Sequence, residues 1–141
     1  MKNSIEKALA MAAVAHQGQK DKAGRPYIMH PMTVAVNMKS TDGIITALLH
    51  DVVEDSDITF ADLEGKFTPN IIEALKLLTH EKGTDYFEYI HKIKENELAR
   101  AVKIQDLIHN SDLSRLENVS QKDIDRCAKY KKALAILVSK N

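Results

Sequence analysis

The densest group of chemically active side chains lies in the segment ITALLHDVVED, residues 45–55. An apolar run there leads directly into His50 and Asp51, and Glu54 and Asp55 follow closely. On a helix, His50 and Glu54 are four residues apart, as are Asp51 and Asp55, so their side chains lie on adjacent stripes of one surface. Three carboxylates within five residues repel one another, and a bound divalent cation would offset that repulsion. The segment therefore indicates a metal site.

Two protein ligands rarely hold a catalytic metal, so further ligands are expected elsewhere in the chain. His30 lies in the proline-bounded segment YIMHP, and Asp106 lies on an otherwise apolar helical stripe. With His50 and Asp51 they form a mixed nitrogen and oxygen set, which suits Mn²⁺, Fe²⁺ or Zn²⁺ better than Mg²⁺. His16 ends the first expected helix, and two interpretations of it stay open: a helix cap, or a residue in or beside this site.

The remaining histidines and the single cysteine carry weaker signals. His80, His91 and His109 are predicted to lie at the surface or at the edge of the core. Cys127 is predicted to be a small packing residue. Because it is the only cysteine, an intrachain disulfide and a cysteine-rich zinc site are both excluded.

The overall composition is that of a globular protein. The 141 residues are 44% hydrophobic and 28% charged, and 20 basic side chains balance 20 acidic ones. The resulting net charge of +0 argues against long-range attraction to nucleic acid or to an anionic membrane. Glu6 and Lys7 interrupt the apolar N-terminal stretch, so no secretory signal is expected, and no apolar run approaches the roughly 18 residues of a membrane span. We therefore expect a cytoplasmic protein.

Helical periodicity dominates the sequence, so the chemically active residues are expected on or between helices. Helix starts are predicted at Ser4, Asp42, Thr59, Pro69 and Asp85. The helix that follows Asp42 is expected to continue through Val52 and so to carry His50 and Asp51.

Other segments complete this outline of the fold. Residues 19–31 contain two prolines and are expected to form a loop, whereas residues 32–38 fit either a helix or a short strand. Further helices are expected over residues 98–110 and about 121–139. About seven helices and no convincing sheet predict a compact all-α bundle that forms one domain over residues 1–141.

Three segments taken together resemble the hydrolase domain of the RelA/SpoT family, in the HD superfamily of metal-dependent phosphohydrolases. The segments are AHQGQKDKAGRPYIMHP, ALLHDVVEDSDIT and VKIQDLIHNSDLSRL. The resemblance extends from about Ile5 to Leu116, with the motifs in the family's order and spacing. Enzymes of this family remove the 3′-diphosphate from the guanosine alarmones (p)ppGpp. The length of the chain resembles that of a stand-alone small alarmone hydrolase without a synthetase domain.

The resemblance implies a role for each matching position. The implied ligands of one Mn²⁺ ion are His30, His50, Asp51 and Asp106. Glu54 and Asp55 match the acidic pair of hydrolysis-competent members, which orients a metal-activated water and handles its proton. Lys22 matches a position that contacts substrate phosphate, and Asn110 matches one that contacts the nucleotide. The implied partner is therefore a small nucleotide substrate, and the oligomeric state stays open.

Two positions depart from the family pattern. Family members commonly have an arginine where this chain has Asp21, and that arginine packs against the guanine base. An acidic side chain cannot supply the same cationic stacking. The family also commonly has an arginine after the downstream aspartate, whereas Leu107 follows Asp106 here. Both departures leave the metal machinery intact and base specificity open, and Asp21→Arg is expected to improve the use of guanine substrates if this loop faces the base.

Four functions remain under consideration. An alarmone 3′-pyrophosphohydrolase that uses Mn²⁺ is favoured. An HD phosphohydrolase for another nucleotide or phosphorylated metabolite is the second hypothesis, favoured by Asp21 and Leu107. The third is a nucleotide-binding module without turnover, against which the intact Glu54–Asp55 pair argues. The fourth, a structural helical protein with a solvated acidic face, leaves the four ligand-type residues unexplained.

Overall fold

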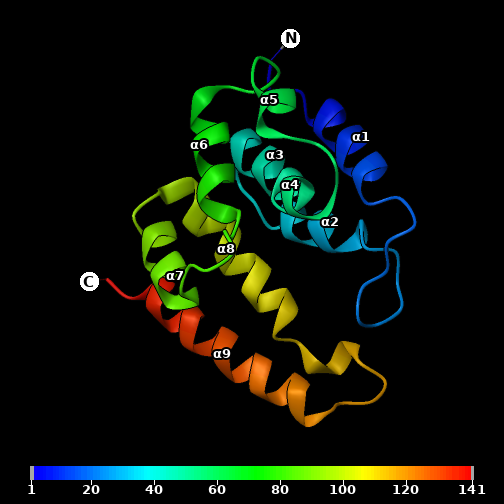
Figure 1. The fold of residues 1–141 in the computed structure, drawn as a ribbon, viewed down its shortest axis with the longest axis vertical. Helices are drawn as coiled ribbons and strands as arrows, with labels where there is room; N and C mark the ends of the chain where they lie inside the picture. The colour runs from blue at the N-terminus through cyan, green and yellow to red at the C-terminus, as the bar shows by residue number, and fades with distance from the viewer. Residues whose placement is uncertain (1, 141) are drawn as a thin grey trace.

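The structure is a computed structural model that describes residues 2–140, and its regular elements are helices (Figure 1). In chain order they are α1 (Ile5–Ala15), α2 (Met29–Val36), α3 (Thr41–Leu49), α4 (Val52–Asp55), α5 (Phe60–Leu63), α6 (Pro69–Leu78), α7 (Tyr86–Lys94), α8 (Glu97–Asn110), the 3₁₀ helix η1 (Leu113–Arg115) and α9 (Gln121–Val138). Within residues 2–140, seven α-helices have eight residues or more, and no strand forms beyond two isolated bridges. The prediction of an all-α fold with about seven helices is confirmed.

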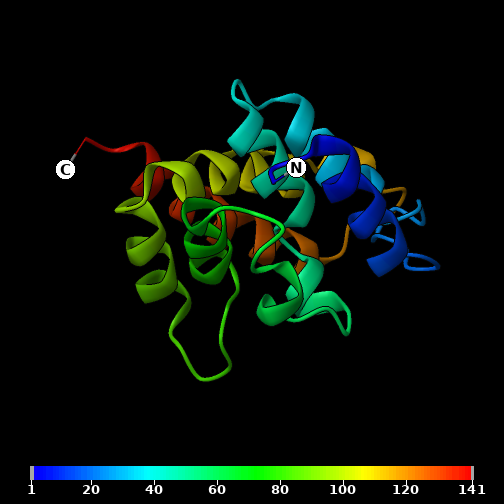
Figure 2. The same cartoon turned by 90° about the horizontal axis from the view of Figure 1, so that it is seen from above.

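Helix α8 runs through the middle of the fold (Figure 2). It packs against α2 and α3 on one side and against α6, α7 and α9 on the other. Helix α1 covers α3, and α9 closes the bundle against α7 and α8. Side chains of α8 therefore contact both groups of helices.

Local sequence signals account for most helix starts. The side chains of Ser4, Thr59 and Asp85 each accept a hydrogen bond from a backbone N–H in the first turn of their helix. These bonds satisfy N–H groups that have no partner within the helix. Pro69 is the first residue of α6, where its missing N–H costs nothing. These four predicted starts are confirmed.

The segment that carries His50 and Asp51 departs from the prediction. Helix α3 begins after Ser40, whose Oγ accepts from the N–H of Gly43, so the predicted N-cap at Asp42 is wrong. The predicted single helix through Val52 is also wrong. Helix α3 ends at Leu49 and α4 begins at Val52, and between them Asp51 has φ −108° and ψ 1°.

The bend between α3 and α4 has a physical reason. Adjacent side chains on a straight helix point about 100° apart, because a turn contains 3.6 residues. A local break at Asp51 allows His50 and Asp51 to approach the same point. The break thus lies at the polar pair, between two segments with apolar side chains.

Residues 29–36 form a helix, which excludes the strand alternative for this region. Helix α2 begins at Met29, inside the segment predicted to be a loop, and Pro31 occupies its first turn. Proline is tolerated there because its ring does not disrupt an existing helical hydrogen bond. His30 therefore lies on a helix and not in a mobile turn.

The hydrophobic core extends through all the long helices. Its largest fully buried aliphatic and aromatic side chains are Phe67, Ile45, Leu49, Leu63, Ile71, Leu75, Ile90, Ile93, Leu107 and Leu137. Leu107, which replaces the family's arginine, is thus a packing residue. Among the helices of residues 2–140, none combines the length and the apolar character that a membrane span requires.

Ile45 anchors α3 in this core, and truncating it is a test of the packing. Ile45 is 0% exposed, so Ile45→Ala is expected to lower the free energy of unfolding by about 2 to 5 kcal/mol through lost burial and a residual cavity. Val36→Ala is the matched control, because Val36 is 80% exposed and its truncation should change stability by no more than about 0.5 kcal/mol. Urea unfolding of both variants measures the difference. Equal losses would show that α3 does not pack as described.

Candidate metal centre

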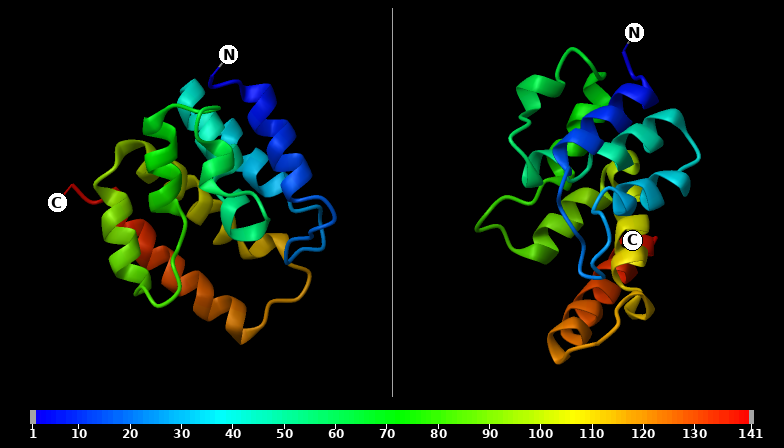
Figure 3. Two further views of the ribbon diagram at one scale, coloured as in Figure 1. Left: turned by 45° about the horizontal axis from the view of Figure 1, so that its top comes forward. Right: turned by 90° about the vertical axis from the view of Figure 1, so that its right-hand side faces the viewer.

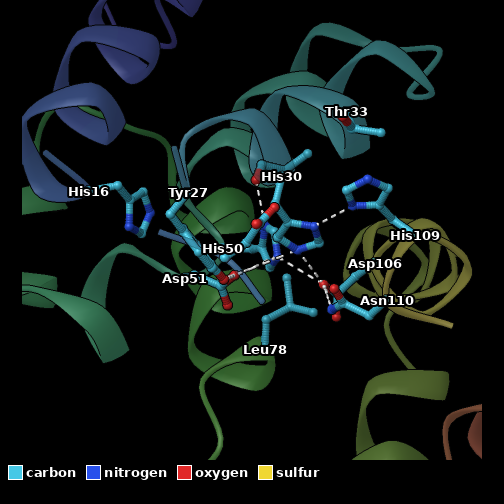
Figure 4. Close-up of polar contacts among 12 residues, drawn as sticks. His16, Tyr27, His30, Thr33, His50, Asp51, Leu78, Asp106, His109 and Asn110 are labelled. Carbon is cyan, nitrogen blue, oxygen red and sulfur yellow. Dashed lines mark hydrogen bonds and ion pairs between the residues drawn. The ribbon is translucent and has the colours of Figure 1, made fainter. Parts of the chain in front are cut away.

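Four residues from separate parts of the chain converge beside α8 (Figure 4). His30 comes from the first turn of α2, His50 and Asp51 come from the bend between α3 and α4, and Asp106 comes from α8. One ligand-type atom from each of the four lies within 4.8 Å of all the others. The structure therefore brings together the four residues that the sequence pattern selected.

The distances within this group are short. His30 Nε2 lies 2.8 Å from Asp106 Oδ1, and His50 Nε2 lies 3.3 Å from the same oxygen. His50 Nε2 also lies 3.1 Å from Asp51 Oδ2. His30, His50 and Asp106 are almost completely buried, whereas the side chain of Asp51 is 20% exposed. The group is thus an internal cluster with its accessible side at Asp51.

The two imidazole rings are oriented by hydrogen bonds at their other nitrogen. His50 Nδ1 donates to the carbonyl of Ala47 at 2.6 Å, which leaves the Nε2 lone pair directed at the cluster. His30 Nδ1 lies 2.7 Å from His109 Nδ1. When His30 Nε2 is a ligand, its Nδ1 carries the hydrogen and donates to His109. Burial and the nearby charge of Arg115 lower the pKa of His109, which favours the neutral ring that such an acceptor needs.

The carboxylates are also held by fixed donors. The Tyr27 hydroxyl donates to Asp51 Oδ2 at 2.5 Å. Lys103 Nζ donates to Asp106 Oδ2 at 2.8 Å, and Asn110 Nδ2 donates to Asp106 Oδ1 at 3.1 Å. Burial alone would raise the pKa of Asp106, but the Lys103 charge and the bonds to the two histidines hold it well below its ordinary value. Asp106 is therefore an ionised carboxylate inside the core.

These residues fit a divalent transition metal. Two imidazole nitrogens and two carboxylates face one point, and partners outside the group fix their orientation, as in protein metal sites. Burial disfavours a charged His50 ring, yet the carboxylates of Asp51 and Asp106 raise its pKa well above the ordinary value. The same negative field attracts a cation.

Glu54 and Asp55 lie beside this group and not within it. Both are exposed on α4, and Glu54 Oε1 accepts a hydrogen bond of 2.6 Å from the backbone N–H of His80. The loop between α6 and α7 thus holds the Glu54 carboxylate. The carbonyl of Asp55 accepts from Gln19 Nε2 at 2.8 Å, which ties the end of α4 to the loop after α1.

His16 belongs to the surroundings of the cluster. It is the C-cap of α1, and its buried ring packs against Tyr27 with a centroid distance of 4.8 Å. Its Nδ1 lies 2.9 Å from Gln19 Oε1. Its two neighbours both contact the site, because Tyr27 donates to Asp51 and Gln19 donates to the carbonyl of Asp55. Each of the two interpretations of His16, a helix cap or a residue beside the site, therefore describes part of its position. His16 caps a helix and supports the site from outside the ligand group.

Three residues with evident positions in the site were not singled out from the sequence as part of it. His109 was predicted to be a surface or core-edge residue, and its intermediate burial agrees with that, but its contact with His30 was not predicted. A signal existed, since His109 lies three residues after Asp106 and so on the same face of α8. Lys103 lies three residues before Asp106 and had the same signal. Tyr27 gave no comparable signal, because a tyrosine in a loop is ordinary until the fold shows its contacts.

A cavity of about 330 Å³ adjoins the cluster. Tyr27 and Asn110 line it, and each also donates to a carboxylate of the cluster. Lys22 and Arg115 line it as well, so both residues matched to substrate contacts in the sequence, Lys22 and Asn110, face one space. Its volume is in the range of small-molecule binding pockets.

Residues 8–107 match the family model described as HD domain, and this range contains all four residues of the cluster. The chain belongs to the HD domain family. The segment after residue 107, which includes Asn110, Arg115 and α9, lies outside the family match.

Several curated proteins are similar to this HD domain. A guanosine-3′,5′-bis(diphosphate) 3′-pyrophosphohydrolase of Aquifex aeolicus is 30% identical over 118 residues, which are 75% of this chain and 17% of that protein. The bifunctional (p)ppGpp synthase/hydrolase SpoT of Escherichia coli is 38% identical over 88 residues, 57% of this chain and 12% of that protein. The chain therefore spans about a sixth or less of the length of these two relatives.

Two shorter relatives are covered more fully. The guanosine-3′,5′-bis(diphosphate) 3′-pyrophosphohydrolase MESH1 of Danio rerio is 37% identical over 119 residues, 74% of this chain and 66% of that protein. A solved structure of a metazoan SpoT ortholog, described as hydrolysing ppGpp, superposes with a TM-score of 0.76 at 27% identity. The superposition covers 97% of this chain and 86% of that one. The HD fold therefore extends over nearly the whole chain.

The contact between His109 and His30 leads to a prediction about metal affinity. His109→Ala removes the acceptor that orients His30, so divalent metal is expected to bind about 10- to 100-fold more weakly. Titration against a chelator of known affinity measures the change. Ile108→Ala is the control, because Ile108 is the neighbouring residue and is 48% exposed. Unchanged affinity in His109→Ala would remove this histidine from the metal site.

Proposed function

We propose that this HD domain hydrolyses the 3′-diphosphate of (p)ppGpp, releasing pyrophosphate and GDP or GTP, with Mn²⁺ bound by the cluster. The observation that carries the proposal is the position of the buried cluster beside a cavity lined by Lys22 and Asn110. The similarity to the Danio rerio and Aquifex aeolicus pyrophosphohydrolases supports the same reaction. The proposed ligands of the ion are His30, His50, Asp51 and Asp106.

Each residue of the proposed site has a distinct task. A bound divalent ion supplies Lewis acidity, which lowers the pKa of a water and stabilises charge on a phosphate oxygen. His109 and Ala47 keep the two imidazole rings in the orientation that a ligand needs. Burial and the charge of Asp51 raise the pKa of Tyr27, so its hydroxyl stays protonated and keeps Asp51 in place.

Glu54 is proposed to orient the attacking water and to accept its proton. Its carboxylate is exposed on α4, three residues after Asp51, and the His80 N–H fixes one of its oxygens. A carboxylate held at such a position contributes to catalysis as a general base. Asp55 is proposed to assist it, since Gln19 anchors the backbone at that residue.

The nucleotide is proposed to occupy the cavity next to the cluster. Lys22 would neutralise substrate phosphate there, and the amide of Asn110 would contact the nucleotide near Asp106. Helix α9 contributes Arg126 and Tyr130 to the same walls. We therefore propose that residues 1–141 act as one phosphohydrolase domain, including the segment beyond the family match.

A second candidate is an HD phosphohydrolase with another nucleotide as substrate. The observation that favours it is the acidic side chain of Asp21 in the wall of the cavity, where the family commonly has arginine. This alternative retains the proposed metal ligands and Glu54. It differs only in the part of the nucleotide that is recognised.

A panel of nucleotides assayed with and without Mn²⁺ tests the proposal. The panel contains ppGpp, pppGpp, NTPs, dNTPs and NADPH, and phosphate and pyrophosphate release are measured. Mn²⁺-dependent conversion of ppGpp to GDP and pyrophosphate is expected. Turnover of a different nucleotide alone would move the assignment to the second candidate. Retention of metal without any turnover would make the domain a binding module.

Two substitutions separate metal binding from the chemical step. Asp51→Ala is expected to abolish both metal binding and hydrolysis, because it removes a proposed ligand. Glu54→Gln is expected to retain the metal and to lose about 100-fold or more in kcat, because the amide cannot accept the proton. Glu88→Gln, an exposed carboxylate on α7, is the control and should match the unmodified protein. An unchanged kcat in Glu54→Gln would remove Glu54 from the mechanism.

A further inference from the structure

Asp21 fixes the loop between α1 and α2. Its Oδ1 accepts from the N–H groups of Ala23 and Arg25, both at 2.9 Å. Its own N–H donates to the carbonyl of Arg25, and the N–H of Tyr27 donates to the carbonyl of Gln19. The loop is therefore a closed hairpin that is held by backbone hydrogen bonds and by one carboxylate oxygen of Asp21.

The second oxygen of Asp21 binds Arg115. Arg115 Nη2 donates to Asp21 Oδ2 at 3.0 Å, and Arg115 Nη1 donates to the carbonyl of His109 at 3.1 Å. Burial opposes a charge on Asp21, but the two N–H groups and the Arg115 guanidinium together lower the pKa of its carboxyl. Asp21 therefore stays ionised, and its charge is matched by a guanidinium held at two points.

The Asp21–Arg115 pair joins two distant segments at the edge of the proposed nucleotide cavity. Figure 3 shows the loop after α1 beside the segment that links α8 to α9. Asp21 and Arg115 both line the 330 Å³ cavity, with Tyr27 and Asn110 at the end next to the metal cluster. The family commonly has an arginine at position 21, and in this chain Arg115 supplies a guanidinium to the same cavity.

The donors of Arg115 and its apolar neighbours suit a purine base, while Lys20, Lys22 and Arg126 in the same cavity offer cations for phosphate. An arginine carries five N–H donors, and only two of them bind Asp21 and the His109 carbonyl, so the others can bind a ligand. Leu113, Leu116 and Tyr130 line the cavity with it, and apolar and aromatic walls suit a purine ring. A planar guanidinium can bind O6 and N7 of guanine with two hydrogen bonds, whereas adenine presents an amino donor in place of O6.

We propose that Arg115, oriented by Asp21, recognises the guanine base of the nucleotide in this cavity. The inference rests on the proposed function, because it takes the ligand to be a guanine nucleotide. Arg115 is the residue that determines specificity, and Asp21 is a positioning residue that acts through it. The expectation for Asp21→Arg is then reversed. A second guanidinium at position 21 would repel Arg115 and weaken guanine binding.

Equilibrium binding of GDP and ADP, measured by calorimetry with the intact protein, tests this assignment without requiring turnover. The unmodified protein is expected to prefer GDP. Arg115→Met keeps the length of the side chain without its charge, and it is expected to reduce the GDP-to-ADP preference about tenfold or more. Asp21→Asn retains an acceptor for the loop N–H groups but not the ion pair, so a smaller reduction is expected. In the Arg115→Met background, Asp21→Asn should have no further effect.

Arg25→Met is the matched control, because Arg25 lies in the same loop and does not line this cavity. Its GDP-to-ADP preference should equal that of the unmodified protein. Circular dichroism and metal content confirm that each variant is folded. Asp21→Arg replaces the negative charge with a positive one, and weaker GDP binding is expected for it.

Three outcomes would overturn the assignment. They are an unmodified protein without GDP preference, an unchanged preference in Arg115→Met, and an equal loss of GDP and ADP binding, which would place Arg115 on a phosphate. Failure of the proposed function is a separate result. A protein that selects GDP through Arg115 but does not hydrolyse ppGpp would refute the reaction and retain the base assignment.

Discussion

The buried charge of Asp106 is the constraint on which the rest of the site depends. An ionised carboxylate in a protein core costs several kcal/mol unless partners compensate for the lost hydration. Asp106 lies on α8, the helix that contacts both halves of the bundle, and its partners are His30 from α2, His50 from the end of α3, and Lys103 and Asn110 from α8 itself. Removing any one of them leaves a charge without full compensation. The requirement therefore holds α2, α3 and α8 in a single arrangement, and that arrangement creates the metal site.

The same requirement extends outward from the ligand group. Asp51 needs Tyr27, and the Tyr27 ring packs against His16, which caps α1. Gln19 then connects this cap to the backbone at the end of α4. A continuous series of contacts thus leads from a buried carboxylate to the segment that carries Glu54 and Asp55. The position of the proposed general base is in this way linked to His16 and Gln19, which belong neither to the ligand group nor to the lining of the cavity.

Sequence patterns predicted what is encoded locally. The capping side chains of Ser4, Thr59 and Asp85 act within one turn, and residue type and spacing, together with the family resemblance, selected the four residues of the cluster. The break in the helix at Asp51 was not predictable, because the apolar pattern on both sides continues without interruption. The partners Tyr27 and Arg115 were also out of reach, whereas the spacing of His109 from Asp106 on α8 was a usable signal. The contacts of Tyr27 and Arg115 join residues 24 and 94 positions apart, and nothing in a single sequence identifies such pairs.

Asp21 shows why a family position is best judged with its neighbours in space. Compared position by position, an aspartate in place of arginine is the loss of a cation from the nucleotide pocket. In the folded chain the Asp21 carboxylate accepts hydrogen bonds from the N–H groups of Ala23 and Arg25 and from the guanidinium of Arg115. The ion pair holds that guanidinium in the wall of the same cavity. Asp21 and Arg115 are therefore best considered as one ion pair, in which Asp21 also binds the loop N–H groups and Arg115 also binds the His109 carbonyl. The cavity keeps a guanidinium held at two points, supplied from the segment after α8, and the proposed base recognition depends on where that group lies and not on which residue of the motif provides it.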